Sequence, residues 1–227
     1  MNMNPNIAID GPAGAGKSTV AKVLAGRLGL VYVDTGAMYR AMAIYFLRKS
    51  LSQDDEAGIS AACEDAEVSI AYLDGAQQVF LNGENVTPYL RDEEVGRMAS
   101  ASSVYGAVRT RLVALQQKLA SQTAVVMDGR DIGTVVLPDA GLKIFLTAST
   151  AERARRRVLE LREKGIACDP EQIERDIEER DYRDSHRAIG PLKQAEDAVL
   201  VDSTDMDAEQ VIETIETLYR ERLGADD

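Results

Sequence analysis

Residues 11–18, Gly-Pro-Ala-Gly-Ala-Gly-Lys-Ser, restrict the fold of this chain more than any other segment. They match the pattern G-x-x-x-x-G-K-[ST], in which backbone N–H groups and the lysine converge on phosphate oxygens. The apolar run at residues 7–10 reads as a buried strand, and apolar residues at helical spacing follow from 18 to 28. Because strand, glycine-rich turn and helix stand in the order that this chemistry requires, the sequence predicts a phosphate-binding loop after a strand.

The rest of the chain alternates short apolar runs with longer helical patterns. Four further runs read as strands, at residues 31–34, 124–128, 142–146 and 198–202. Helical patterns cover residues 37–51, 93–122 with a break near 105–106, 150–164, 169–187 and 206–223. Five strands separated by helices predict an α/β fold of the P-loop NTPase type, with a five-stranded parallel sheet and helices on both faces.

A segment at residues 67–89 departs from this alternation. Apolar and polar residues alternate around the pair Asp74-Gly75, and a second such pair, Asn82-Gly83, follows. Both pairs favour the left-handed backbone of tight hairpin turns. We therefore expect a small β-rich insertion in the otherwise parallel α/β chain.

The charge of the chain is strongly acidic, with a formal net charge of −12. Proteins that bind nucleic-acid polymers need a basic surface, so we expect no such partner. The arginines are nevertheless concentrated, because nine of the 19 lie within residues 153–187. The planar guanidinium suits phosphate, so this segment is a candidate anion-binding region. A solvated helix with internal ion pairs is the alternative interpretation.

The sequence also bears on location. No apolar run reaches the roughly 18 residues of a membrane helix, so no membrane partner is expected. The first six residues lack the charged and apolar regions of a signal peptide. Cys63 and Cys168 lie far apart and have no metal-site spacing, which favours a reduced, cytoplasmic chain.

Polar residues at predicted strand ends are candidates for the chemistry. Asp128 closes an apolar strand and is typical of an acid that holds Mg²⁺ together with Ser18, although a simple strand-end cap is the alternative. Segments 34–40 and 128–134 follow strands, where parallel-sheet proteins bind ligands. Segment 179–187 alternates charge signs, which is also typical of a solvent-exposed helix. The chain has no Asn-Lys-x-Asp pattern, so guanine recognition of the GTPase kind is not expected.

Together these motifs resemble the bacterial cytidylate kinase family, in chain order from about residue 7 to the last helix. The segments that carry the resemblance are residues 7–19, 34–40, 128–134, 143–146, 179–181, 187–188, 191–192 and 202–204. The resemblance implies a monomeric kinase that uses ATP and Mg²⁺ and transfers the γ-phosphoryl group to CMP or dCMP. It also implies one kinase unit with a core of residues 1–34, 94–149 and 190–227, a monophosphate-binding part with the β insertion at about 35–93, and a helical lid at about 150–189.

The resemblance further implies roles for single residues. The residues that it implies for ATP binding are Gly11, Pro12, Ala13, Gly14, Ala15, Gly16, Lys17, Ser18 and Thr19. The residues that it implies for catalysis are Lys17, Arg130, Arg153 and Arg157. Substrate binding falls to Thr35, Arg109 and Asp131 for cytosine, Ser100, Arg180 and Asp184 for the sugar, Arg40, Arg130 and Arg187 for phosphate, and also Tyr39. An acid suits the cytosine amino group, whereas uracil offers a carbonyl there. Many relatives have serine at the position of Thr35, which bears on the balance among CMP, dCMP and UMP.

The expected chemistry is mainly positioning and charge neutralisation, because the attacking phosphate oxygen is already an anion. Arg153 and Arg157, four residues apart on one helix, are expected to face the same side. Two other functions stay open: a P-loop kinase for another small molecule such as shikimate, and a nucleotide-dependent switch. An assay of ATP consumption with different acceptors separates the three.

Overall fold

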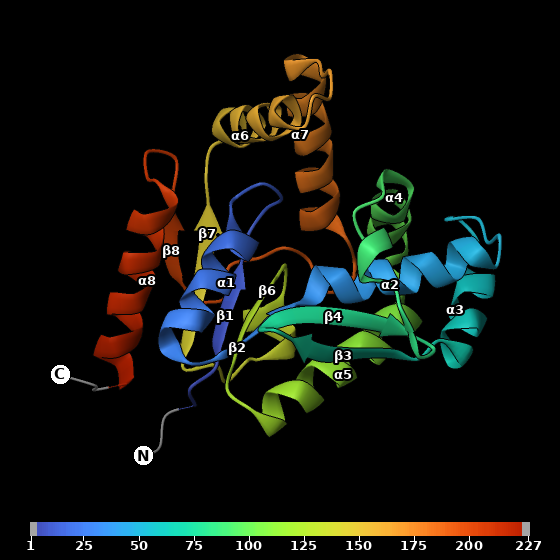
Figure 1. Ribbon diagram of the computed structural model, residues 1–227, viewed down its shortest axis with the longest axis horizontal. Coiled ribbons are helices and arrows are strands. Elements are labelled where there is room, and N and C mark those ends of the chain that lie inside the picture. Colours follow the sequence, from blue (N-terminus) through green and yellow to red (C-terminus); the bar gives the residue numbers. More distant parts are fainter. Residues whose placement is uncertain (1–3, 224–227) are drawn as a thin grey trace. The chain divides into compact units, whose positions relative to one another are not determined.

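The computed structural model describes residues 4–223 (Figure 1). The chain divides into two compact units. The first combines the residues up to Tyr32 with those from Thr123 onward, and the second is Val33–Gln122. The phosphate-binding loop belongs to the first unit and the β-rich insertion to the second. Within residues 4–223, no helix is both long and apolar enough to cross a bilayer.

A five-stranded sheet forms the centre of the first unit, although one edge strand crosses the boundary between residues 32 and 33. Its strands are β1 (Ile7–Asp10), β2 (Val31–Asp34), β6 (Val125–Gly129), β7 (Leu142–Thr147) and β8 (Val199–Asp202), in the spatial order β2-β6-β1-β7-β8. Strand β1 pairs in parallel with β6 and β7, so Ile9 lies opposite Asp128 on one side and Ile144 on the other. All four residues of β1 are buried, as expected of a central parallel strand. The predicted five-stranded parallel sheet is confirmed.

Two helices cover one face of this sheet. α1 (Lys17–Leu28) and α8 (Ala208–Leu223) pack against each other and against the strands, side by side in Figure 1. Leu24 of α1 and Ile215 of α8 join the strand residues Ile9 and Ile144 in one buried apolar cluster. This cluster holds the start of α1, and therefore the phosphate-binding loop, in a fixed place on the sheet.

Two charged helices follow β7 in the first unit. α6 (Thr150–Glu163) and α7 (Pro170–His186) pack against each other beyond the carboxyl end of β7 (Figure 1). Each has a side-chain N-cap, because Ser149 Oγ accepts from Glu152 N and Asp169 Oδ1 accepts from Glu171 N. These helices match the predicted patterns at 150–164 and 169–187 within one residue at each end.

The second unit contains the predicted hairpin. Strands β3 (Val68–Leu73), β4 (Ala76–Leu81) and β5 (Glu84–Asn85) form an antiparallel sheet in that order. Its two turns have positive φ at both central residues, 51° and 73° at Asp74 and Gly75 and 48° and 81° at Asn82 and Gly83. Left-handed backbone at both central positions is the hairpin geometry that these dipeptides favour, so the β-rich insertion is confirmed.

Helices make up the rest of the second unit. They are α2 (Thr35–Arg48), α3 (Glu56–Asp65), α4 (Glu93–Ser102) and α5 (Gly106–Gln122), with a single 3₁₀ turn at Thr87–Tyr89. The break between α4 and α5 falls where the sequence predicts it. Helix α3 was not predicted, because its sequence is rich in small residues and buries only Ile59 and Cys63.

Three predicted helix bounds were wrong, and side-chain caps explain the two at N-termini. α2 begins at Thr35, not residue 37, because Asp34 Oδ1 accepts a hydrogen bond from Ala37 N; it ends at Arg48 rather than 51. α8 begins at Ala208 rather than 206, because Asp207 and Gln210 bond reciprocally through side chain and backbone.

Candidate active site

The loop between β1 and α1 has the backbone of an anion cradle. Gly11, Gly14 and Gly16 have φ values of 149°, 78° and 84°, which other residues rarely adopt. A Cβ at Gly11 would lie 1.9 Å from the Leu146 carbonyl oxygen, so only glycine fits there. These glycines permit a loop that leads directly into α1, with Gly16 as its N-cap, and the backbone N–H groups at a helix N-terminus favour an anion.

Lys17, the first residue of α1, is folded back over the loop. Its Nζ donates to the Pro12 carbonyl oxygen at 2.7 Å, and the residue is buried. Burial and the nearby Arg130 guanidinium lower the pKa of Lys17 well below its usual range, against the opposing effect of Asp128. The ammonium is therefore held in a poorly solvated place where a phosphate would gain most from it.

Ser18 and Asp128 meet at the carboxyl ends of the sheet. Ser18 Oγ donates to Asp128 Oδ2 at 2.8 Å, and Tyr32 Oη donates to Asp128 Oδ1 at 3.0 Å. The predicted Walker-B acid thus lies next to the predicted Mg²⁺ ligand of the loop. A hydroxyl and a carboxylate are the hard oxygen donors that Mg²⁺ prefers, so these two residues fit that ion.

Asp10 is a site residue that sequence reasoning missed. Its Oδ1 accepts from Ile132 N and its Oδ2 from Gly133 N, both at 2.7 Å. It thereby anchors a π-type turn at Ile132–Val136, directly after Asp131. Burial raises the pKa of the Asp10 carboxyl to about 6, and the Asp131 charge adds to that rise. The only sequence signal is its position at the end of the strand before the loop.

The raised pKa of Asp10 makes a prediction for stability. An acid whose pKa is higher in the folded chain than its ordinary 3.8 binds its proton more tightly in the folded state. Its contribution to stability is therefore complete below pH 3.8 and is lost as pH rises through about 6. This group should lower the free energy of unfolding by up to about 3 kcal/mol between about pH 4 and pH 7. Urea unfolding of wild type and Asp10→Asn across this range checks it.

The comparison with Asp10→Asn isolates this group, because Asp184 and the other carboxyls titrate in both proteins. We expect the unfolding free energy of wild type minus that of the variant to fall as pH rises, because only wild type carries the titrating Asp10 carboxyl. A difference that is constant from about pH 4 to pH 7 would contradict the raised pKa of Asp10.

Two arginine–aspartate pairs join the segment after β6 to the region of α7. Arg130 Nε lies 2.7 Å from Asp184 Oδ2, and Arg187 Nη2 lies 3.5 Å from Asp131 Oδ1. Burial acts to raise the pKa of Asp184, but the Arg130 guanidinium overrides it and keeps that pKa below its usual range. Four residues predicted to bind the acceptor are thus brought together within the first unit. Arg180 lies on α7, and its charge helps to lower the pKa of Lys17 and that of Asp184.

The two arginines predicted on α6 have different surroundings. Arg153 is buried, pairs with Asp181 at 2.6 Å and donates from Nη1 to the Ala13 carbonyl oxygen of the loop at 3.1 Å. Arg157 has 49% of its side chain exposed and pairs with Glu160 at 2.7 Å. Arg153 therefore ties α6 to the phosphate-binding loop, whereas Arg157 is a surface residue in this conformation.

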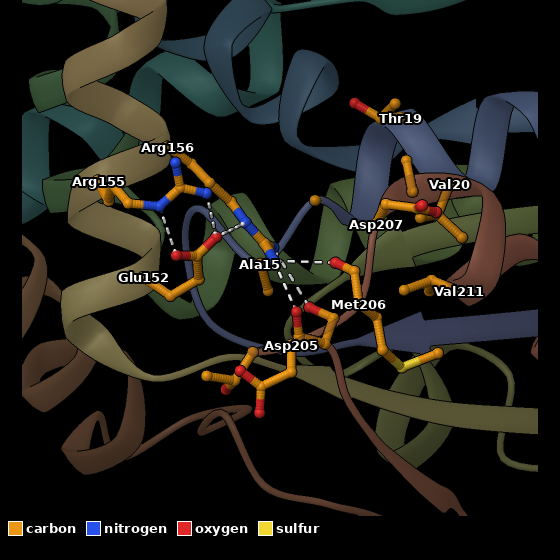
Figure 2. Close-up of a pocket in the computed structure, with 14 residues that line it drawn as sticks. Ala15, Thr19, Val20, Glu152, Arg155, Arg156, Asp205, Met206, Asp207 and Val211 are labelled. Carbon is orange, nitrogen blue, oxygen red and sulfur yellow. Dashed lines mark hydrogen bonds and ion pairs between the residues drawn. The ribbon is translucent and has the colours of Figure 1, made fainter.

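A cavity of about 500 Å³ adjoins the loop and was not predicted (Figure 2). Its lining comes from the phosphate-binding loop, α1, α6, the segment between β8 and α8, and the start of α8. It includes Ala15, Gly16, Thr19, Arg156, Thr204 and Met206. Of the loop residues predicted to bind ATP, Ala15, Gly16 and Thr19 therefore face this cavity. The signal available in the sequence was the pair of polar residues after the last strand, Ser203 and Thr204, whose chemistry alone did not indicate a pocket.

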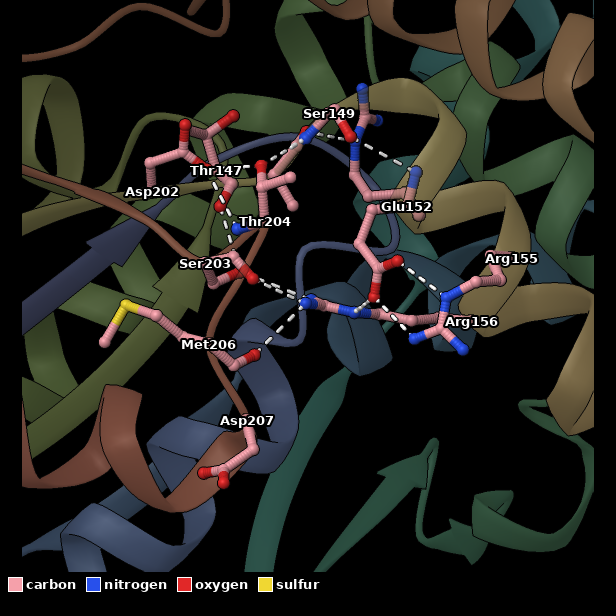
Figure 3. Close-up of polar contacts among 12 residues, drawn as sticks. Thr147, Ser149, Glu152, Arg155, Arg156, Asp202, Ser203, Thr204, Met206 and Asp207 are labelled. Atoms are coloured by element: carbon pink, nitrogen blue, oxygen red, sulfur yellow. Dashed lines mark hydrogen bonds and ion pairs between the residues drawn. The ribbon is translucent and has the colours of Figure 1, made fainter.

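Arg156 forms one wall of this cavity and is held from two sides (Figure 3). Its Nε donates to Glu152 Oε1 at 2.8 Å, and its Nη2 donates to the Ser203 carbonyl oxygen at 2.6 Å. Glu152 also accepts from Arg155, and hydrogen bonds from Arg155 and then Arg156 lower the pKa of Glu152 to about 2. The N–H groups at the edge of the guanidinium thus make charge-assisted hydrogen bonds that fix its plane. These bonds do not use the flat face of the group, on which a ring can stack.

The predicted acceptor residues of the second unit lie on three helices. Thr35 is the buried first residue of α2, and Tyr39 and Arg40 follow on the same helix. Ser100 lies on α4. Arg109 is buried on α5, and its Nη1 donates to Tyr39 Oη at 3.4 Å. The second unit thus brings Tyr39 and Arg109 together.

Comparison with known proteins assigns the family. A family model described as cytidylate kinase matches residues 7–221. The chain belongs to the cytidylate kinase family. A curated cytidylate kinase of Pelotomaculum thermopropionicum is 51% identical over 216 residues, 95% of this chain and 96% of that protein. One of Caldicellulosiruptor bescii is 50% identical over 214 residues, 94% of this chain and 95% of that protein.

Membership of the cytidylate kinase family makes this chain an ATP-dependent nucleoside monophosphate kinase. A solved structure of an uncharacterized protein from Eubacterium ventriosum agrees in fold, with a TM-score of 0.53 at 14% identity over 97% of this chain and 99% of that one. That likeness bears on the fold alone. The evidence for the activity comes from the sequence relatives.

Proposed function

We propose that the chain transfers the γ-phosphoryl group of ATP to CMP or dCMP, giving ADP and CDP or dCDP. One observation supports this most: the phosphate-binding loop shares the first unit with the two arginine–aspartate pairs, Arg130–Asp184 and Arg187–Asp131. A nucleotide-dependent switch needs the loop but not a second set of paired charges. The sequence relatives named above support the same activity.

The donor triphosphate binds to residues 11–19, where glycine N–H groups and Lys17 meet its oxygens. Its base enters the cavity beside the loop and stacks on the face of Arg156. Ser18 and Asp128 would hold Mg²⁺, which supplies positive charge to the β- and γ-phosphate oxygens. These assignments explain why hydrogen bonds fix the edge of the Arg156 guanidinium, and why the Ser18 hydroxyl and the Asp128 carboxylate lie together.

Replacing Arg156 by alanine removes the wall on which the donor base stacks. We expect KM for ATP to rise about 3- to 30-fold, the range of a stacking cation, with KM for CMP changed less than twofold. Steady-state kinetics with each substrate varied in turn measures both. Arg162→Ala, at an exposed site on the same helix, is the matched control. Equal rises in both KM values would contradict the donor role.

We assign acceptor residues within each unit separately. In the first, Asp131 accepts from the cytosine N4 amino group, Asp184 and Arg180 contact the sugar, and Arg130 and Arg187 bind the phosphate. In the second, the corresponding set is Thr35 and Arg109 for the base, Ser100 for the sugar and Arg40 for the phosphate, with Tyr39 beside Arg109. Arg and Asp supply donors and acceptors that complement cytosine, and Arg forms paired bonds to phosphate.

The reaction is a displacement at the γ-phosphorus. An oxygen of the acceptor phosphate forms the new P–O bond while the bond to the ADP leaving oxygen breaks. No general base is needed, because the attacking oxygen is an anion at neutral pH. Lys17, Arg130, Arg153 and Arg157 share the charge that builds on the transferred group. Arg157 is half exposed and paired with Glu160 here, so its part in this step requires that it leave that ion pair.

An acceptor panel tests the proposal. ADP release is measured with ATP and Mg²⁺ in the presence of CMP, dCMP, UMP, AMP or shikimate. We expect fast turnover with CMP and dCMP, slower turnover with UMP and little with the others. Preference for a different acceptor would retain a P-loop kinase and reject the cytosine assignment. The proposal also includes a monomer in the cytoplasm, which gel filtration and localisation measurements address.

A further inference from the structure

The β-rich insertion touches the backbone just ahead of α2 through one side chain, Gln77 of β4. Gln77 Oε1 accepts from the Asp34 backbone N–H at 2.8 Å, and Gln77 Nε2 donates to the Asp34 carbonyl oxygen at 3.2 Å. A carboxamide presents one acceptor and one donor, as a peptide group does. Gln77 therefore satisfies both backbone groups of Asp34 in the way that a neighbouring strand would. Only one orientation of the amide can make both bonds, so its assignment is fixed.

Asp34 stands at the junction where β2 ends and α2 begins. Its backbone is held by Gln77, and its side-chain Oδ1 accepts from Ala37 N as the N-cap of α2. Thr35, the next residue, is buried as the first residue of that helix. The position of Thr35 thus depends on bonds that Gln77 makes one residue earlier.

The insertion is attached to α2 at a second point. Arg48 at the end of α2 forms two parallel hydrogen bonds with Glu84 of β5, of 2.7 Å and 2.8 Å. Val79 and Leu81 of β4 are buried, and β4 packs on α2. Both ends of α2 are therefore braced by the insertion, but only the Gln77 contact adjoins residues assigned to the acceptor.

We propose that Gln77 is a positioning residue for acceptor recognition: its carboxamide fixes the Asp34 backbone and, through it, the hydroxyl of Thr35. The inference rests on the proposed function, in which Thr35 contacts cytosine. It gives the insertion a role in the choice of acceptor base rather than in donor binding. Tight recognition of a base requires donors and acceptors held within fractions of an ångström, which a loose strand end would not provide.

The chain offers a closely matched control in Gln78. It is the next residue on β4, is also half-buried, and its side chain points to the other face of the strand, where Gln78 Oε1 accepts from Asn85 Nδ2 at 3.1 Å. Gln77→Met removes both bonds to Asp34 at nearly constant side-chain length. Gln78→Met makes the same chemical change on the face that does not touch Asp34.

The test is steady-state kinetics of wild type, Gln77→Met and Gln78→Met, together with calorimetric binding of CMP. We expect Gln77→Met to raise KM and Kd for CMP about tenfold, because a Thr35 hydroxyl that is no longer held in place loses about one hydrogen bond to the base. The preference for CMP over UMP should fall as well. KM for ATP should change less than twofold. Gln78→Met should match wild type in all of these quantities.

Several results would overturn the inference. Unchanged KM and Kd for CMP in Gln77→Met would remove the role of Gln77 and leave the proposed function intact. Equal weakening of ATP and CMP, with a lower thermal midpoint, would make Gln77 a purely structural residue. If Gln77→Met does not fold, Gln77→Glu, which keeps only the acceptor, decides by the same CMP-specific criterion. Wild type without CMP-dependent turnover would reject the proposed function and the inference together.

Discussion

Replacing Lys17 by methionine is expected to lower kcat about 10²- to 10³-fold, the cost of losing one pre-placed charge on the transferred group. The effect should be large because the ammonium is buried, so no water replaces it when charge develops. Its position over the loop, bonded to the Pro12 carbonyl oxygen, needs little rearrangement to meet a phosphate. Rapid-quench or steady-state assays with saturating ATP and CMP measure the loss.

The stability of this variant separates a catalytic loss from unfolding. Burial lowers the pKa of Lys17, so its charge costs free energy in the folded chain, and methionine should not lower the thermal midpoint. Lys22→Met, at an exposed position on the same helix, should keep wild-type turnover. If Lys17→Met retained activity within about threefold of wild type, the assignment of the phosphate-binding loop would be untenable.

Replacing Asp131 by alanine should have the largest effect on substrate choice. The carboxylate is buried, and in the proposal it accepts from the cytosine amino group, a charge-assisted bond worth about 1.5–3 kcal/mol. We expect kcat/KM for CMP to fall about 10- to 100-fold. The value for UMP should fall less, because the uracil carbonyl gains nothing from that acid. The ratio of the two kcat/KM values, measured in parallel, is the readout.

A loss of the Arg187 contact accompanies this change, since Arg187 Nη2 lies 3.5 Å from Asp131 Oδ1. That loss affects both acceptors, so only the ratio reports on base reading. Asp139→Ala, an exposed acid in the following segment, serves as the control and should leave the ratio unchanged. A parallel fall for CMP and UMP in Asp131→Ala would mean that Asp131 positions Arg187 and does not read the base.

The sequence predicted the parts of this structure that depend on local patterns. The five apolar runs became the five strands because parallel strands are buried along their whole length. The turns at Asp74-Gly75 and Asn82-Gly83 followed from residues that tolerate positive φ. The loop at residues 11–18 followed from a motif whose glycines leave few other conformations.

The parts that escaped prediction depend on contacts between distant segments. Asp10 bonds to residues more than 120 positions later, and Gln77 bonds to Asp34 across 43 positions. Arg156 is held at the cavity wall partly by Ser203, 47 residues away, which accepts its hydrogen bonds. An Asp, a Gln or an Arg has no local signature for such roles. Helix α3 escaped for a different reason, since small residues give it almost no apolar periodicity.

Transfer of a radioactive label is the most direct measurement of the central claim. ATP labelled in its γ-phosphate is incubated with Mg²⁺, CMP and the wild-type chain, and the products are separated by chromatography. We expect the label to appear in CDP at the same rate as ADP forms, and to depend on Lys17. Label released as inorganic phosphate, at a rate indifferent to CMP, would contradict phosphoryl transfer to CMP and indicate a nucleotide hydrolase.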